Sequence, residues 1–323
     1  MEELELKGHC FFAIGDCTIL NANVVGFNKD MYAKYKDSDV FEGKTFYDFV
    51  NDYEWTWEKM IEISSLVYID RSGDGKTLDD TYGFSSNNWE YSTSIIQASG
   101  IKLLEMDEGG NWKMAINNSV NYPKMQHLVE ILSEWYKSEN AYVAFKDASW
   151  NSEPIVEMTT GRTLMSFSST RWIEGWLDYN LDFGVLPYPM YDTNQKQYYS
   201  LQNSGLLALP TYMTDPLMSA ESMEMFSYYS EPVKITFYEK LLGKQIADAP
   251  EDAMMLDIIW DSLCLDIGYN FCQVDYNLPI PYTLSLTTDP DPSTGSETNL
   301  ASLIAKKESL VNNGMASLLR GLK

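Results

Sequence analysis

The residues best suited to ligand binding follow an apolar run in the middle of the chain. Arg171 and Trp172 come directly after three hydroxyl residues, 168–170, and Trp176 stands four positions beyond Trp172. The hydroxyls can cap a helix that starts here, and the i,i+4 spacing places both indoles on one helical face. A helix N-terminus beside an indole suits a ligand with hydroxyls and a flat apolar face, such as a sugar. The alternative is that both tryptophans belong to the core.

A second polar cluster has the spacing of a calcium-binding loop. Asp70, Ser72 and Asp74 occupy alternate positions, and Gly75 takes the position that a sharp turn requires. The twelfth position would be Thr81, which cannot bind calcium in a bidentate manner. We therefore expect an Asx/Gly turn. A weak structural calcium is the alternative, and no other cofactor is expected.

Motifs of metal-dependent or nucleophilic catalysis are absent from the sequence. It has 2 histidines, and none of its 4 cysteines forms a C-x-x-C pair, so the usual zinc spacing is missing. There is no G-x-S-x-G, H-E-x-x-H, P-loop or G-x-G-x-x-G motif. The sequence therefore favours a binding protein over an enzyme. A glycoside hydrolase remains the alternative, because two carboxylates flanking a bond leave no motif.

The composition bounds the class of protein. The 323 residues suggest about two domains, and 45% hydrophobic residues suffice for a full core. A net charge of -24 repels phosphate backbones, which excludes a nucleic-acid partner. No run of eighteen apolar residues is present, and the acidic start of the chain does not match a signal peptide.

The elements that position these residues include both strands and helices. Residues 183–186 form a short apolar run closed by Pro187 and Pro189, typical of a buried strand. Thr56 is the expected N-cap of a helix whose buried face includes Trp57 and Met60. Further helices are expected from the apolar spacing over residues 125–136, 218–229, 233–242 and 300–318.

Several of these segments resemble extracellular solute-binding proteins of ABC importers, in the sugar-binding group that includes maltose-binding protein. The resemblance rests on the run Thr160-Gly161-Arg162-Thr163-Leu164-Met165, on Arg171-Trp172, and on Asp182-Phe183-Gly184-Val185-Leu186-Pro187-Tyr188-Pro189. Leu164 departs from the small residue that is usual there. Residues 24–32, 53–60, 82–84 and 205–210 also match family patterns.

The resemblance implies a type II periplasmic-binding-protein-like fold, with two α/β lobes joined by a hinge. Residues 1–27 would be a remnant of the first lobe and hinge, 28–205 the complete second lobe, and 206–323 the return to the first lobe with the C-terminal helices. About one hundred residues that open the first lobe in family members have no counterpart before residue 24, so the chain is expected to lack the start of that lobe.

The resemblance also implies the ligand and the partners. Trp172 would be the stacking platform for a carbohydrate, with Arg171, Trp89, Glu90 and Tyr199 as companions in the cleft. The protein would deliver an oligosaccharide to the permease subunits of an ABC transporter. It would act outside the cell, held at the membrane by a lipid anchor that this chain lacks. The alternative is a truncated fragment that binds nothing.

Overall fold

The fold is built on a six-stranded mixed sheet. The computed structural model describes residues 5–6, 9–10, 21–144, 155–179, 181–202, 205, 207–209, 212–236, 250–271, 283–288 and 299–321. Within these residues the strand order is β10-β3-β9-β5-β4, and β8 pairs with residues 84–87 of β5, next to the segment that pairs with β4. The strands are β3 (Asn23–Asn28), β4 (Tyr68–Ile69), β5 (Thr81–Asn87), β8 (Ala141–Ala144), β9 (Thr163–Ser169) and β10 (Phe183–Leu186).

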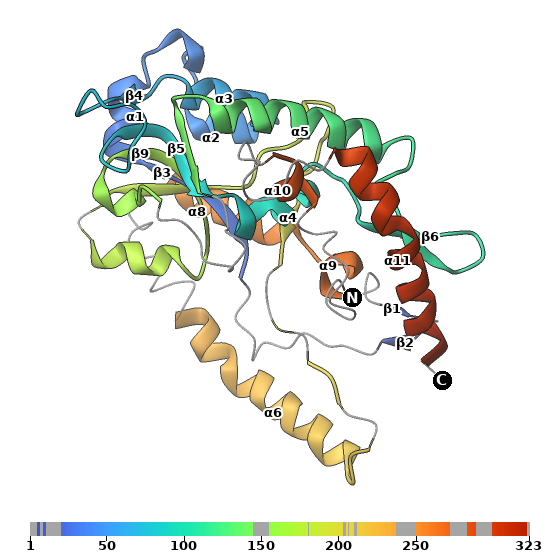
Figure 1. The fold of residues 1–323 in the computed structure, drawn as a ribbon. Coiled ribbons are helices and arrows are strands. Elements are labelled where there is room, and N and C mark those ends of the chain that lie inside the picture. Colours follow the sequence, from blue (N-terminus) through green and yellow to red (C-terminus); the bar gives the residue numbers. More distant parts are fainter. Residues whose placement is uncertain are drawn as a thin grey trace.

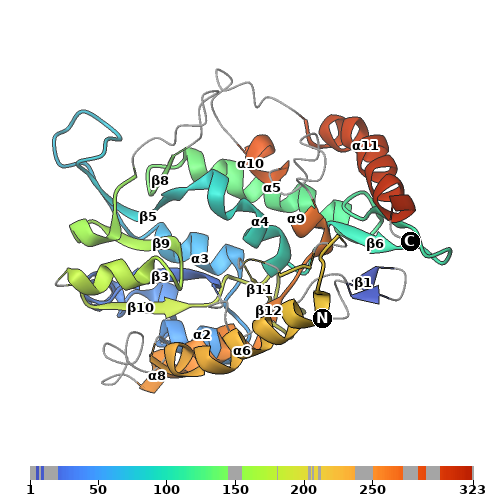
Figure 2. The ribbon, with the colours of Figure 1, turned by 90° about the horizontal axis from the view of Figure 1, so that it is seen from below.

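Strand direction determines which ends of the strands meet. β5 is parallel to β8 and β9, whereas β3 is antiparallel to β9 and to β10. The C-terminal ends of β5, β8 and β9 therefore lie at the same edge as the start of β3. Parallel strands need helical crossovers, and these cover the sheet (Figures 1 and 2). The chain thus has the expected α/β architecture.

The two faces of the sheet belong to two separate cores, as the alternation of side chains along β3 shows. Val25 and Phe27 join the larger core, whereas Val24 packs in a smaller core with Trp176 and Ile259. Successive residues of a strand point to opposite faces, so a fully apolar strand requires cover on both sides. All residues of β3 and of β9 are buried, including the four hydroxyl residues of β9.

Short helices and α5 cover the sheet on the side of the larger core. They are α1 (Lys29–Tyr35), the 3-10 helix η2 (Asp39–Phe41), α2 (Phe46–Asn51), α3 (Trp57–Ser64), α4 (Asn88–Ala98) and α5 (Asn121–Lys137). Thr56 caps α3 by accepting the N–H of Lys59, as expected. The predicted stripe on α5 is confirmed, since Met125, Leu128 and Leu132 are fully buried.

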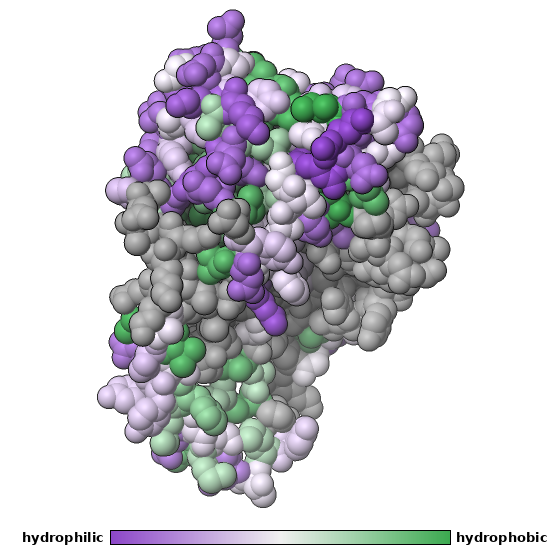
Figure 3. Space-filling view, turned by 90° about the vertical axis from the view of Figure 1, so that its left-hand side faces the viewer, coloured by the Kyte–Doolittle hydropathy of each residue, from purple (hydrophilic) through white to green (hydrophobic). Residues whose placement is uncertain are grey.

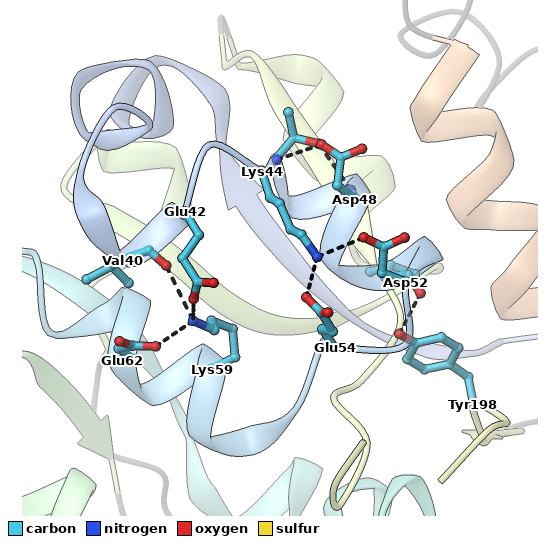
Figure 4. A network of polar contacts seen from close by, with 11 residues as sticks. Val40, Glu42, Lys44, Asp48, Asp52, Glu54, Lys59, Glu62 and Tyr198 are labelled. Atoms are coloured by element: carbon cyan, nitrogen blue, oxygen red, sulfur yellow. Dashed lines mark hydrogen bonds and ion pairs between the residues drawn. The ribbon is translucent and has the colours of Figure 1, made fainter. Parts of the chain in front are cut away.

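Two lysines tie η2, α2 and α3 together on the surface (Figure 4). Lys59 Nζ lies 2.9 Å from Glu42 and 2.7 Å from Glu62. Lys44 Nζ contacts Asp52 at 2.8 Å and Glu54 at 2.5 Å. The hydrogen bonds to these two carboxylates raise the pKa of Lys44. Exposed pairs contribute little individually, but this network fixes the mutual positions of three short elements.

The remaining elements lie before β3, between the strands of the sheet, or after β10. They are β1 (Glu5–Leu6), β2 (His9–Cys10), β6 (Leu104–Met106), β7 (Trp112–Met114), η3 (Met158–Thr160), η4 (Ile173–Asp178), β11 (Ser200–Leu201), α6 (Pro216–Ile235), α8 (Pro250–Asp261), β12 (Leu263–Cys264), α9 (Ile267–Phe271), α10 (Thr283–Thr288) and α11 (Leu300–Gly321). In the described part of the chain, no helix combines the length and apolar character needed to span a membrane.

The C-terminal helices pack on the lobe that precedes them in sequence. α10 contacts α4 and α5, and α11 contacts β7 (Figure 1). By packing, α10 and α11 therefore lie with the part of the chain numbered 28–205, whereas the predicted boundaries assign them to the first lobe. Those lobe boundaries stay a prediction.

Helix α6 extends away from the body of the molecule (Figure 1). It is one helix through Pro232, whereas the sequence predicts a break there. A proline can bend a helix instead of ending it, because it removes a single backbone hydrogen bond. Many large apolar side chains of α6 are exposed, and Figure 3 shows hydrophobic residues on the corresponding projection. These include Leu217, Met225, Phe226, Tyr228 and Val233.

A nearly buried ion pair fastens α8 to the sheet. Asp252 is 1% exposed, lies 2.5 Å from Lys29 Nζ and accepts a hydrogen bond from the hydroxyl of Tyr47 at 2.6 Å.

Asp252→Asn should lower the free energy of unfolding by about 2 kcal/mol. A fully buried pair would cost more, but Lys29 keeps contact with water and with Asp182 at 3.7 Å. Urea unfolding measures this, and Glu251→Gln on the exposed side of α8 should be neutral. Equal stability of both variants would contradict the prediction.

Candidate ligand-binding site

The candidate site lies at the edge of the sheet where β5, β8 and β9 end. Asn23, the first residue of β3, pairs with Ser169, the last residue of β9. Phe84 pairs with Met165 in parallel register, which places the end of β5 level with the end of β9. Ligands of open α/β sheets bind outside the carboxyl ends of the strands. The predicted ligand residues that follow β5 and β9 therefore converge on the edge where such ligands bind.

Trp172 is exposed, but its backbone is firmly held. Its side chain is 65% exposed, and the Arg171 guanidinium lies 5.9 Å from the centre of the indole ring. The preceding residue, Thr170, donates its N–H to Ala22 O at 2.9 Å and accepts the Ala22 N–H at 3.1 Å. The Arg171 N–H bonds Asn21 Oδ1 at 3.1 Å. A flat apolar face that is fixed yet open to solvent is well suited to stacking on a ligand.

The two tryptophans do not share a face, which corrects the expectation from their spacing. The segment after Trp172 is the 3-10 helix η4, and three residues per turn rotate positions i and i+4 apart. Trp176 is therefore core, at 8% exposure, and its ring lies against Gly26 and Phe183. A Cβ at Gly26 would come within 2.4 Å of this indole. Trp172 is left free on the surface.

The hydroxyl residues before Trp172 do not cap this helix, which is a second correction. Ser168 and Ser169 belong to β9, and the N-cap of η4 is Trp172, without a side-chain hydrogen bond. The hydroxyl of Thr170 instead serves the backbone of Ala22. The strand runs two residues further than expected because Asn23 and Val24 pair with Ser169 and Ser168.

Buried polar groups lie at this edge of the sheet, and they are called its floor below. Asn23 donates its side-chain amide to Ser94 Oγ at 2.5 Å. The hydroxyls of Ser86 and Ser169 and the amide nitrogen of Gln202 have no hydrogen-bond partner within the described residues. Gln202 belongs here because it forms a bridge with Ala22. Buried polar groups normally have a partner, so this floor offers donors and acceptors to a polar ligand.

Sequence reasoning missed Asn23 and Gln202 as site residues. Their signal is weak, because each is a single amide next to an apolar strand. Only the pairing of β3 with β9 and the bridge from Ala22 to Gln202 bring them to the sheet edge. A polar residue at either end of a buried strand is the pattern that could have indicated them, since Asn23 begins β3 and Gln202 follows β11.

Trp89 and Glu90 lie in the first turn of α4, directly after β5. The register of β5 with β9 brings this turn to the edge that also carries Arg171 and Trp172. The structure describes the backbone of these two positions but not their side chains. Their contact with a ligand thus stays a prediction.

Tyr199 does not join the other predicted residues. It lies at the opposite end of α4, where its ring faces Gly100 and lines a cavity with Gln97. Eleven helical residues span about 16 Å, which separates this cavity from the start of α4. Sequence position near a crossover was therefore a poor guide to the location of Tyr199.

The loop after β4 is an Asx turn. Both carboxylate oxygens of Asp70 accept backbone N–H groups, from Ser72, Gly73 and Gly75. The hydroxyl of Ser72 bonds Asp74. Among the residues that the structure describes, no group of three or more His, Cys, Asp or Glu side chains is arranged to hold a metal. The weak structural calcium at Asp70, Ser72 and Asp74 stays a prediction that a calcium titration can test.

Asp80 accepts hydrogen bonds from the backbone of this loop, and its titration makes the stability of the protein depend on pH. Its carboxylate accepts the N–H of Arg71 at 2.9 Å and of Thr77 at 2.8 Å, and these hydrogen bonds lower the pKa of Asp80. Its contribution to folding is therefore fully present above the unfolded pKa of about 3.9 and is lost as the pH falls through the lower folded pKa. Asp80→Asn should flatten the acid side of the stability profile. Urea unfolding between about pH 3 and pH 6 tests this. A profile identical to that of the unchanged protein would contradict it.

Comparison with known proteins gives structural matches alone. No family model and no curated protein sequence matches the chain. An ABC substrate-binding protein from Listeria monocytogenes, solved with cycloalternan, superposes with a TM-score of 0.59 at 13% identity, covering 97% of this chain and 74% of that one. The maltotriose-binding protein of Thermus thermophilus gives 0.54 at 14% identity, with 100% and 75% coverage. The chain has the type II periplasmic-binding-protein-like fold.

A third solved structure agrees with these two. The maltose/maltodextrin-binding domain from Bdellovibrio bacteriovorus, bound to maltotriose, superposes with a TM-score of 0.57 at 13% identity. It covers 95% of this chain and 74% of that one. The predicted fold class is thereby confirmed.

Proposed function

We propose that this protein captures a carbohydrate, in particular an oligosaccharide, for an ABC importer. The observation that carries the proposal is the fixed, exposed indole of Trp172 beside a floor of buried hydroxyl and amide groups. An aromatic face stacks on a sugar ring, and such polar groups bond its hydroxyls. The structural neighbours support the same class of ligand, since those quoted were solved with cycloalternan or maltotriose.

In this proposal the protein binds its ligand and carries out no covalent chemistry on it. In this proposal a hinge closes two lobes on the ligand, with residues 28–205 as the second lobe and the chain crossing between lobes near residues 205–206. Permease subunits, a location outside the cell and attachment by a lipid anchor belong to the same proposal. The neighbours are binding proteins, which supports a function other than catalysis.

Calorimetric titration with maltotriose, cycloalternan and a β-linked trisaccharide such as cellotriose tests the proposal. We expect saturable binding of at least one of them, with a raised unfolding temperature. At one hundred times the dissociation constant, the stabilisation is about 2.7 kcal/mol. Absence of binding across the panel would reject an oligosaccharide of these types. Turnover of aryl glycosides above the buffer rate would favour the hydrolase alternative.

A further inference from the structure

A cavity of about 180 Å³ lies at the C-terminal end of α4, away from the candidate site. Its walls come from four segments: the end of α4, the β6–β7 hairpin, the residue before β11, and the residues after β12. β11 and β12 pair in parallel, so Tyr199 and Asp266 are brought to one place from distant parts of the chain. A molecule in this cavity would contact all four segments.

The floor of the cavity is polar and buried. Asp266 is 9% exposed, and its carboxylate accepts the N–H of Tyr269 at 2.9 Å and of Leu103 at 3.4 Å, which fixes its orientation. Burial raises the pKa of Asp266, which favours its neutral form. Gln97, at 5% exposure, places its amide beside this carboxyl but outside hydrogen-bonding geometry.

Two of the lining side chains carry buried polar atoms without a partner within the described residues. They are the indole N–H of Trp112 and both the oxygen and the nitrogen of the Gln97 amide. Leaving a buried donor or acceptor unpaired is unfavourable, so most such groups are paired in folded proteins. The cavity thus presents two donors and an acceptor to an occupant.

The walls define the shape of the occupant. The rings of Trp112 and Tyr199 and the side chains of Ile101 and Ile267 give flat apolar surfaces around the polar floor. The volume is below the roughly 300–1,000 Å³ of pockets for drug-sized ligands, so an oligosaccharide is excluded. The chemistry fits one small ring that has hydroxyls on its rim and an apolar face.

We propose that this cavity is a second binding site, for a neutral hydroxylated ring of the size of one monosaccharide. The site is separate from the sheet edge that carries Trp172 and does not depend on the proposed function. An occupant would contact both α4 and the segments that carry β11 and β12, and would hold them together.

The test uses the full chain with Trp172→Ala, which removes the platform of the other site. Saturation-transfer NMR with glucose, galactose, mannose and xylose should show saturable binding of at least one of them. Adding Gln97→Met, which preserves volume but removes the amide, should weaken that binding at least tenfold. Gln126→Met, on the exposed side of α5, is the matched control and should leave it unchanged.

The outcomes separate this site from the proposed function. No saturable binding by any of the four sugars in Trp172→Ala, or equal binding after Gln97→Met, overturns the second site. If Gln97→Met fails to fold by circular dichroism, Trp112→Phe removes one donor and keeps the ring, and the same weakening is expected. Maltotriose binding by Gln97→Met with Trp172 intact reports on the sheet-edge site alone.

Discussion

Replacing Trp172 by alanine should weaken oligosaccharide binding about thirty-fold, which corresponds to about 2 kcal/mol. The indole is 65% exposed, so the loss should appear in affinity and not in stability. Titration with the oligosaccharide that binds best among maltotriose, cycloalternan and cellotriose measures the affinity. Urea unfolding of the same variant checks that stability stays within about 0.5 kcal/mol.

Two further variants make this prediction specific to the indole face. Trp172→Phe keeps an aromatic ring and should retain most of the affinity. Tyr179→Ala removes another exposed aromatic side chain, at the far end of η4, and should bind as the unchanged protein does. Full affinity in Trp172→Ala would contradict the role of Trp172 as the stacking platform.

Gly83→Ala should be the most destabilising small substitution in the sheet. A Cβ at Gly83 would lie 1.8 Å from the backbone oxygen of Ser64, at the end of α3. A backbone atom cannot move aside without the helix, and Ser64 also receives the indole N–H of Trp135 at 2.7 Å. We expect a loss of about 3 kcal/mol or more in the free energy of unfolding.

The same one-carbon addition elsewhere provides the control for Gly83. Gly175, in η4, has no atom within 4 Å of its ideal Cβ position, so Gly175→Ala should change stability by no more than about 0.5 kcal/mol. Urea unfolding compares the two variants. Equal stability of Gly83→Ala and Gly175→Ala would contradict the close approach of β5 to α3.

The sequence predicted the elements whose pattern is local and long. The α5 stripe and the buried strand β10 follow from the spacing of apolar residues, and the Thr56 cap of α3 follows from its residue type before an apolar face. The two apolar patterns extend over several turns or strand positions. A prediction that rests on several positions depends little on the preference of any single residue.

Contacts between distant segments could not be predicted in the same way. Trp176 belongs to the core because its ring lies against Gly26, 150 positions earlier. Tyr199 lies at the far end of α4 because β11 pairs with β12. Asn23 and Gln202 become site residues only through sheet pairing. Propensity and spacing carry no information on such partners.

The contrast between Trp172 and the core tryptophans gives the protein a built-in optical probe. Among the tryptophans whose side chains the structure describes, Trp55, Trp57, Trp135 and Trp176 are buried, and Trp172 alone is exposed. Its emission should be the most red-shifted and the most accessible to a neutral quencher such as acrylamide. A ligand stacked on the indole would shield it, so quenching of the intact chain would report occupancy without any label.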